Sequence, residues 1–118
     1  MKIILLLSCI LFFKNQSTLS VYWNKTTHNF GNVKKNDLLK TEFTCYNKDS
    51  SQVLIIENIV PSCGCIVSKP SKHQIPFNDS AIISVDFKVG KKVNKQQKNI
   101  VVFTNKGYFE LSLIAHVN

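Results

Sequence analysis

Two cysteines separated by one glycine, Cys63-Gly64-Cys65, are the residues best suited by type and spacing to chemistry. A disulfide needs Cα atoms about 4.4–6.8 Å apart, and fully extended i, i+2 neighbours lie at or just past that limit, at up to roughly 7 Å. A bend at Gly64 would bring the two cysteines within range, because glycine tolerates the backbone angles of a tight turn. Such a small ring would be strained and reduced more readily than a structural bridge.

Three interpretations of this element remain open. Cys63 and Cys65 could form a local staple, or a thiol pair that takes part in redox or mixed-disulfide chemistry. They could also form a soft-metal site, since two thiolates suit Cu(I) or Zn, with His28, His73 or His116 as a further ligand. A finger-type zinc site is not indicated, because no second pair of ligands follows at the required spacing. The sequence predicts no cofactor.

The other two cysteines have different surroundings. Cys45 alternates with Phe43, so we expect its side chain to point inward and act as a small apolar group. A bridge from Cys45 to Cys63 or Cys65 is the alternative. Cys9 lies in the apolar N-terminal segment. If that segment is cleaved off, three cysteines remain, and an odd number leaves at least one thiol without a disulfide partner.

The N-terminus has the pattern of an export signal. Lys2 precedes eleven almost wholly apolar residues, and Lys14 follows them. Eleven residues are too few to cross a hydrocarbon core, which needs about 20. We therefore expect a signal peptide over residues 1–20, a domain over residues 21–118, and a periplasmic or extracellular location. Acylation of Cys9 at a lipoprotein-like Leu-Leu-Ser-Cys is the alternative, and it would be the chain's one link to a membrane.

The charge balance is basic: 15 lysines and no arginine against 7 acidic residues, for a net charge of +8. Arginine is the side chain that recognises guanine and phosphate by paired hydrogen bonds, so we predict no nucleic-acid partner. The densest charge lies over residues 91–95. This stretch is either a solubilising loop or a surface for anionic glycans, lipid headgroups or an acidic partner.

Apolar and polar residues alternate with period two in short runs that polar turns interrupt, which predicts strands. The expected strands cover residues 26–33, 39–46, 53–60, 65–68, 81–88, 97–104 and 109–117. Tyr22 and Trp23 form either an anchoring first strand or a leader with two exposed aromatic rings. About seven strands at this spacing predict an all-β, immunoglobulin-like sandwich. The sequence contains no hydrolase elbow and no glycine-rich phosphate loop, so we predict no enzyme.

Several short motifs occur in a characteristic order: Phe30-Gly31, Phe43, Asn47, Leu54-x-Ile56, Ser62-Cys63-Gly64-Cys65, Ile83-x-Val85-x-Phe87, Ile100-x-Val102 and Thr104-Asn105. Over residues 26–117 the chain resembles the exported bacterial family called domain of unknown function 1573, which is common in Bacteroidota. The resemblance implies an immunoglobulin-like sandwich of the major-sperm-protein type and implies no activity. Ile66 replaces the usual threonine, and residues 76–79 replace the usual Pro-Gly turn.

These observations predict an exported, non-enzymatic module of the bacterial cell envelope. It would bind another envelope protein or a second copy of itself, because edge strands can pair with a partner's extended chain. The alternative function is thiol–disulfide or copper handling at Cys63 and Cys65.

Overall fold

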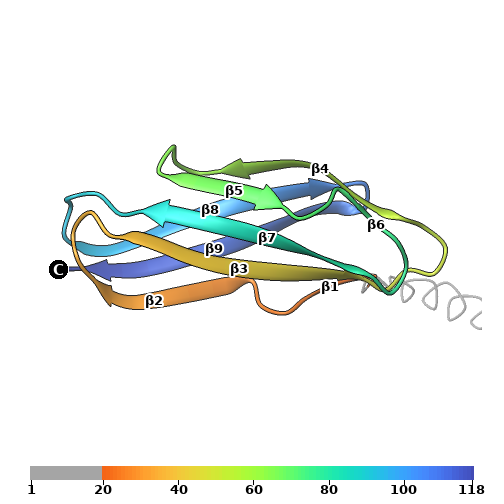
Figure 1. The fold of residues 1–118 in the computed structure, drawn as a ribbon, viewed down its shortest axis with the longest axis horizontal. Coiled ribbons are helices and arrows are strands. Elements are labelled where there is room, and N and C mark those ends of the chain that lie inside the picture. The colour runs from red at the N-terminus through yellow and green to blue at the C-terminus, as the bar shows by residue number, and fades with distance from the viewer. Residues whose placement is uncertain (1–19) are drawn as a thin grey trace, which may run out of the picture.

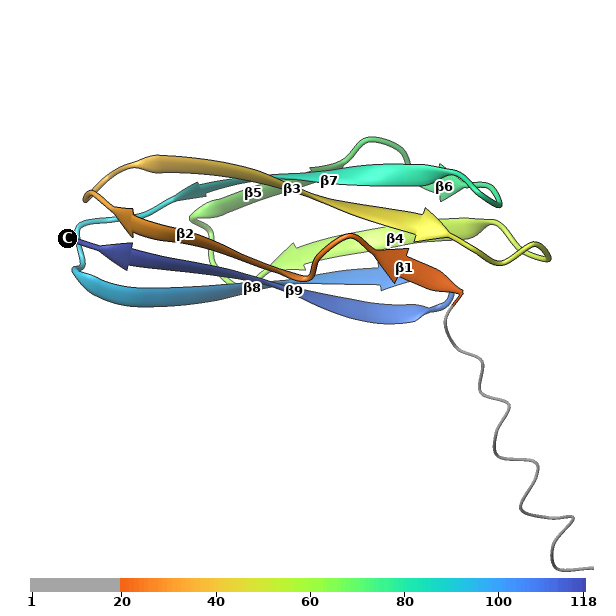
Figure 2. The same cartoon turned by 90° about the horizontal axis from the view of Figure 1, so that it is seen from below.

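A computed structural model describes residues 20–118 as two β-sheets packed face to face (Figures 1 and 2). The four-stranded sheet has the order β1 (Val21–Trp23), β3 (Leu38–Asn47), β7 (Ser80–Lys88), β5 (Ile66–Pro70). The five-stranded sheet has the order β2 (Thr27–Val33), β9 (Gly107–Val117), β8 (Asn94–Thr104), β4 (Leu54–Pro61), β6 (Gln74–Ile75). The predicted all-β sandwich is confirmed. The candidate lipidation site Cys9 and all but the last residue of the expected signal peptide lie outside the described residues.

All seven expected strands are present in the described part of the chain, and two short ones are added. β1 confirms that Tyr22 and Trp23 anchor a first strand, which pairs antiparallel with β3. β6 lies between the strands expected over residues 65–68 and 81–88, where no strand was expected. The strand expected to begin at residue 97 begins at Asn94, because β8 stays paired with β9 out to Asn94↔Val117.

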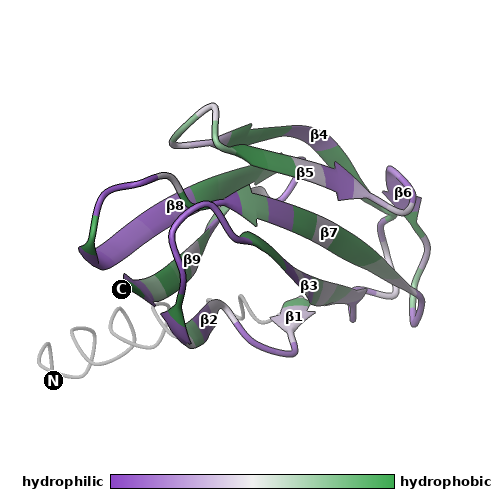
Figure 3. Cartoon of the chain, turned by 60° about the vertical axis from the view of Figure 1, so that its left-hand side comes forward, coloured by the Kyte–Doolittle hydropathy of each residue, from purple (hydrophilic) through white to green (hydrophobic). Residues whose placement is uncertain are grey.

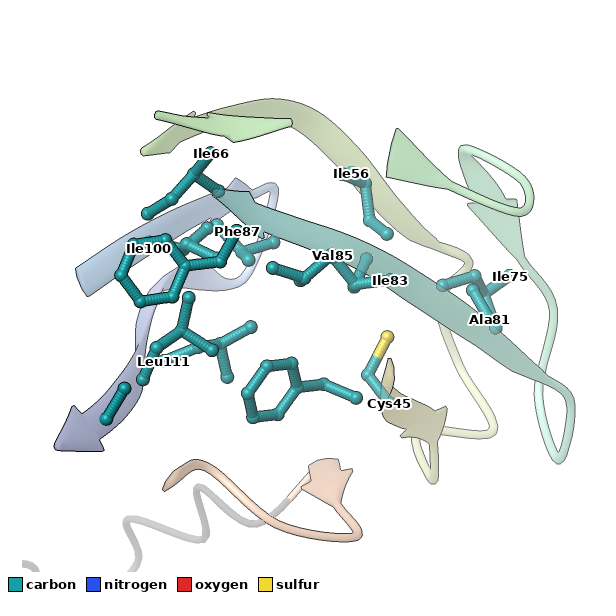
Figure 4. Packing of buried hydrophobic residues seen from close by; sticks show 14 of the residues in the cluster. Cys45, Ile56, Ile66, Ile75, Ala81, Ile83, Val85, Phe87, Ile100 and Leu111 are labelled. Carbon is teal, nitrogen blue, oxygen red and sulfur yellow. The ribbon is translucent and has the colours of Figure 1, made fainter. Parts of the chain in front are cut away.

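The core lies between the two sheets, where the inward-pointing apolar side chains of both sheets pack together (Figure 4). Each sheet supplies apolar side chains that exclude water from the inner face of the other sheet. Burial of apolar surface stabilises the folded state by about 25 cal/mol per Å². The largest fully buried side chains are Phe43, Phe87, Leu54, Ile56, Ile75, Ile83, Ile100, Leu111, Leu113, Val85, Val89 and Val102. The two-residue period of the sequence therefore corresponds to a single apolar layer.

The chain changes sheet at nearly every connection. In the described residues, β1 to β8 alternate strictly between the four-stranded and the five-stranded sheet, and only β8 and β9 form a hairpin within one sheet. That hairpin turns at Gly107, whose φ of 110° lies in the region that favours glycine. The crossing from β4 to β5 takes only four residues, Ser62 to Cys65, and it contains both cysteines of the Cys-Gly-Cys element.

No helix within residues 20–118 has the length and apolar character needed to cross a membrane.

One buried polar side chain, Asn47 at the end of β3, organises the opposite end of the sandwich. Its Nδ2 donates to the carbonyl oxygens of Gln52 (2.9 Å) and Ile75 (2.8 Å), and its Oδ1 accepts from the N–H of Asp49 (2.8 Å). The side chain is wholly buried. A buried amide needs such partners, and here they hold the β3–β4 loop and β6 against the core.

We expect Asn47→Ala to lower the free energy of unfolding by about 3 kcal/mol, because it leaves three backbone groups without partners at a buried site. Asn105→Ala is the matched control: Asn105 also bonds two backbone groups, of Val53 and Ile55, but at an exposed position, so it should cost about 1 kcal/mol. Urea denaturation of the oxidised protein measures both. Equal losses would contradict the structural role given to Asn47.

Candidate functional site

The Cys63–Cys65 turn joins the two sheets. Cys63 and Cys65 form a disulfide, with their Cα atoms 5.2 Å apart. The N–H of Ile66 donates to the carbonyl oxygen of Cys63 (3.3 Å), which closes a tight turn at the start of β5. Both cysteines are half-buried and Gly64 is exposed, so the ring lies at the surface and remains accessible to solvent.

Backbone hydrogen bonds hold this turn on both sides. The N–H of Ser62 donates to the carbonyl oxygen of Asn99 on β8 (2.8 Å), and the N–H of Asn99 donates back to the Ser62 hydroxyl (3.0 Å). On the other sheet, the N–H of Lys88 donates to the carbonyl oxygen of Cys65 (3.0 Å). The turn is therefore held at a defined place between the end of β7 and the middle of β8.

The two sulfur atoms are not equivalent. The backbone N–H of Cys65 donates to the Sγ of Cys63 (3.0 Å). Cys65 packs against the core, and it also lines a surface hollow. A hydrogen bond to sulfur favours the charged form of a thiol, so the bond to Cys63 would stabilise a thiolate there if the disulfide opened.

The hollow beside Cys65 has a volume of about 520 Å³ and is strongly basic. Cys65 lines this hollow together with five lysines: Lys88, Lys91, Lys92, Lys95 and Lys98. None of these five lysines forms an ion pair within residues 20–118, where the ion-paired lysines are Lys40, Lys72 and Lys106. Figure 3 shows the hydrophilic stretch over the β7–β8 loop and the start of β8. The fold thus brings the lysine-rich segment beside the cysteines, which the sequence alone did not indicate.

Gly64 lies in the bend that brings the Cα atoms of Cys63 and Cys65 to 5.2 Å, as expected, and the bend forms without a positive φ at Gly64. Within the described residues, the glycines with positive φ are Gly31 and Gly107. A Cβ built at Gly64 would meet no atom within 4 Å. The backbone of the turn therefore accepts other residues at this position, and what glycine provides is open space beside the sulfur atoms.

Cys45 is a core residue. Its side chain is 1% exposed and its thiol is free, so the alternative bridge to Cys63 or Cys65 is not present (Figure 4). Burial raises the pKa of the Cys45 thiol, because the thiolate would lose its hydration. Cys45 is thus the small apolar group that its alternation with Phe43 predicted.

Of the three histidines weighed as extra metal ligands, His28 and His73 contact other groups, and His116 lies opposite Lys95 in the β8–β9 register. His28 contacts Lys25 and the ring of Phe30, and the pKa of His28 is lowered by burial and by the Lys25 charge. Nδ1 of His73 lies 3.1 Å from the carbonyl oxygen of Ile56. Within residues 20–118, no three His, Cys, Asp or Glu residues gather in a way that could hold a metal ion.

Sequence reasoning missed an apolar surface on the outer face of the five-stranded sheet. Val60, Phe103 and Tyr108 are 44%, 40% and 69% exposed. Strand register places Phe103 opposite Tyr108, and Val60 opposite Val101, while the Phe103 and Tyr108 ring centroids lie 6.2 Å apart. The signal was present in residues 100–103, which are apolar in succession rather than in alternation, as expected of a strand with two apolar faces.

Comparison with known proteins identifies the family. The sequence pattern described as "Protein of unknown function (DUF1573)" matches residues 21–117, nearly all of the part that forms the sandwich. The chain belongs to the DUF1573 family. This confirms the family that the sequence resembles. A search of curated proteins gave no match to the chain.

Solved structures share the fold of this DUF1573 domain at low sequence identity. A protein of unknown function from Porphyromonas gingivalis W83 superposes with a TM-score of 0.69 at 10% identity, over 81% of this chain and 46% of that chain. The PapD-like domain 7 of human CEP192 gives 0.65 at 8% identity, over 84% and 85%. The VesB protease of Vibrio cholerae gives 0.62 at 13% identity, over 86% and 32%. At these identities the likeness concerns the fold alone.

We expect Gly64→Ala to change the free energy of unfolding by less than about 0.5 kcal/mol, because the new methyl group meets open space. Gly107→Ala is the matched control. It places a Cβ at a φ of 110°, which should cost on the order of 1–3 kcal/mol. Urea denaturation of the two oxidised variants compares them. A large loss at Gly64 would mean that the turn does depend on glycine.

Proposed function

We propose that this DUF1573 domain is an exported, non-enzymatic module that binds another protein of the bacterial cell envelope through the outer face of its five-stranded sheet. The observation that carries the proposal is the exposed apolar surface of Val60, Phe103 and Tyr108, which spans three neighbouring strands. Adjacent large apolar side chains in water mark a binding surface more often than single scattered ones.

Charge on the same face indicates the chemistry of the partner. Glu110 lies opposite Val101 in the β8–β9 register, and Glu57 lies in the irregular part of β4 beside Asn58, which pairs with Phe103. Neither glutamate takes part in an ion pair within residues 20–118, where the ion-paired carboxylates are Asp49, Asp79 and Asp86. An apolar surface with two unpaired carboxylates suits a partner that presents apolar side chains together with lysine or arginine.

The solved structures with this fold support the view that the domain acts as one module among others in a larger protein or assembly. This chain corresponds to 46% of the Porphyromonas protein and to 32% of VesB, so in both of them the same fold is one part of a longer chain. Immunoglobulin-like sandwiches host many unrelated functions, and the function lies in surface sites added to the fold. The exposed apolar face is such a surface.

We expect residues 1–20 to be removed on export. The intact mass of the protein recovered from the envelope then corresponds to a chain that begins at Val21. A mass that retains residues 9–118 with added acyl chains would establish the lipoprotein alternative at Cys9. Recovery of all 118 residues from the cytoplasm would contradict export.

Photocrosslinking in the producing cells tests the binding face. A photoreactive amino acid at Tyr108 should give one discrete adduct with a different protein. Glu57→Lys with Glu110→Lys should abolish that adduct, because the positive charges would repel a basic partner. The same probe at Tyr22, which is 57% exposed on the other sheet, is the positional control and should give no such adduct.

The remaining outcomes count against the proposal. An adduct with twice the mass of the chain would identify a second copy as the occupant. An adduct that forms equally at Tyr22, or that survives the two charge reversals, would show that the face does not select its partner. Absence of any adduct at Tyr108 would remove the binding function from this face.

A further inference from the structure

We propose that the Cys63–Cys65 disulfide exchanges with small anionic thiols that bind in the lysine-lined hollow, and that the incoming sulfur attacks Cys65. This site lies apart from the proposed protein-binding face and does not depend on it. Three features of the turn support the exchange: the charge of the hollow, the position of Cys65 in its lining, and the hydrogen bond to Cys63.

The hollow selects by charge. Five lysines line it together with Cys65, and none of them is neutralised by an ion pair within residues 20–118. A volume of about 520 Å³ is of the size of small-molecule sites. A cluster of uncompensated ammonium groups raises the local concentration of anions, so a thiol that carries a carboxylate or sulfonate would be enriched next to the disulfide.

The positions of the two cysteines set the direction of attack. Cys65 lines the hollow and Cys63 is not part of its lining, so a thiol bound there meets Cys65 first. Thiol–disulfide exchange is faster when the leaving sulfur is the better-stabilised thiolate. The Sγ of Cys63 already accepts the N–H of Cys65 at 3.0 Å, which makes Cys63 the favoured leaving group.

The thiolate sulfur of the anionic thiol attacks Sγ of Cys65, a bond forms between those two sulfurs, and the Cys63–Cys65 bond breaks. Its electron pair leaves on Sγ of Cys63. The incoming sulfur is oxidised, Cys63 is reduced, and the domain then carries the thiol as a mixed disulfide on Cys65. Gly64 leaves this approach open, because it places no side chain beside the ring.

A matched series of thiols tests the selection by charge. Mercaptoethanesulfonate, mercaptoethanol and cysteamine share a two-carbon skeleton and carry a negative, a neutral and a positive end group. The rate of disulfide opening is measured for each by mass spectrometry after acid quenching, on the full exported protein. Lys91→Gln with Lys92→Gln should slow mercaptoethanesulfonate on the order of tenfold. The same variant should change the mercaptoethanol rate less than twofold and should not slow cysteamine.

Lys48→Gln with Lys72→Gln is the control, since it removes the same charge at the opposite end of the sandwich, where Lys72 pairs with Asp79. It should leave all three rates within twofold of the unaltered protein. An equal effect of both double variants would show that net charge, not the hollow, governs the rate. Equal slowing of all three thiols by the Lys91 and Lys92 changes would also overturn the proposal.

The site of attack is read from the quenched adduct. Because Gly64 separates the two cysteines, peptide fragmentation distinguishes a thiol attached to Cys65 from one attached to Cys63. We expect the mercaptoethanesulfonate adduct on Cys65. An adduct on Cys63, or an even mixture, would overturn the direction of attack and with it the role given to the hydrogen bond on Cys63.

Discussion

The fold depends on contact between two sheets that the chain enters in alternation. From β1 to β8 every connection leaves one sheet and joins the other, so almost no strand pairs with its neighbour in sequence. Strand pairing alone therefore cannot assemble this domain step by step. The apolar layer between the sheets must form together with the ladders, which is the expected behaviour of folds dominated by contacts distant in sequence.

The same alternation builds the candidate redox site. A connection that crosses between sheets must pass over an end or an edge of the sandwich, so separate crossings come together there. The β4–β5 crossing supplies the disulfide, and the β7–β8 crossing supplies Lys91 and Lys92. Hydrogen bonds from Ser62 to Asn99 in β8 and from Lys88 at the end of β7 to Cys65 fix the first crossing beside the two strands that flank the second. The site is thus a consequence of topology as much as of residue type.

The strands themselves were predictable, because one buried face imposes a period of two on the sequence. The start of β8 was not predicted. Residues Asn94 to Gln97 are all polar and show no alternation, although they are paired with β9. The outer surface of Val60 and Phe103 was missed for a related reason. Alternation reports only that one face is apolar, and cross-strand register is needed to see that outward side chains from different strands meet.

The candidate site was predictable only in part. The Cys-Gly-Cys element was identified from spacing, and the lysine run from composition, but their proximity depends on the pairing of β5 with β7. The bend expected at Gly64 is present, but it closes without a positive φ, which spacing alone does not predict. Spacing fixes how far apart two Cα atoms can lie, whereas the φ of the residue between them depends on the strands to which the turn is attached.

A purely structural role for the disulfide is weak on energetic grounds. A bridge stabilises mainly by restricting the unfolded chain, and closing a loop of three residues contributes about 1.6 kcal/mol in the loop-entropy treatment, roughly half of the value for fifteen residues. Hydrogen bonds from Ser62 to Asn99 and from Lys88 to Cys65 already hold both sides of the crossing. Within one turn, moreover, the bridge connects no distant parts of the chain. In the proposed exchange, the bridge contributes chiefly its sulfur chemistry, beside a hollow that five lysines line together with Cys65.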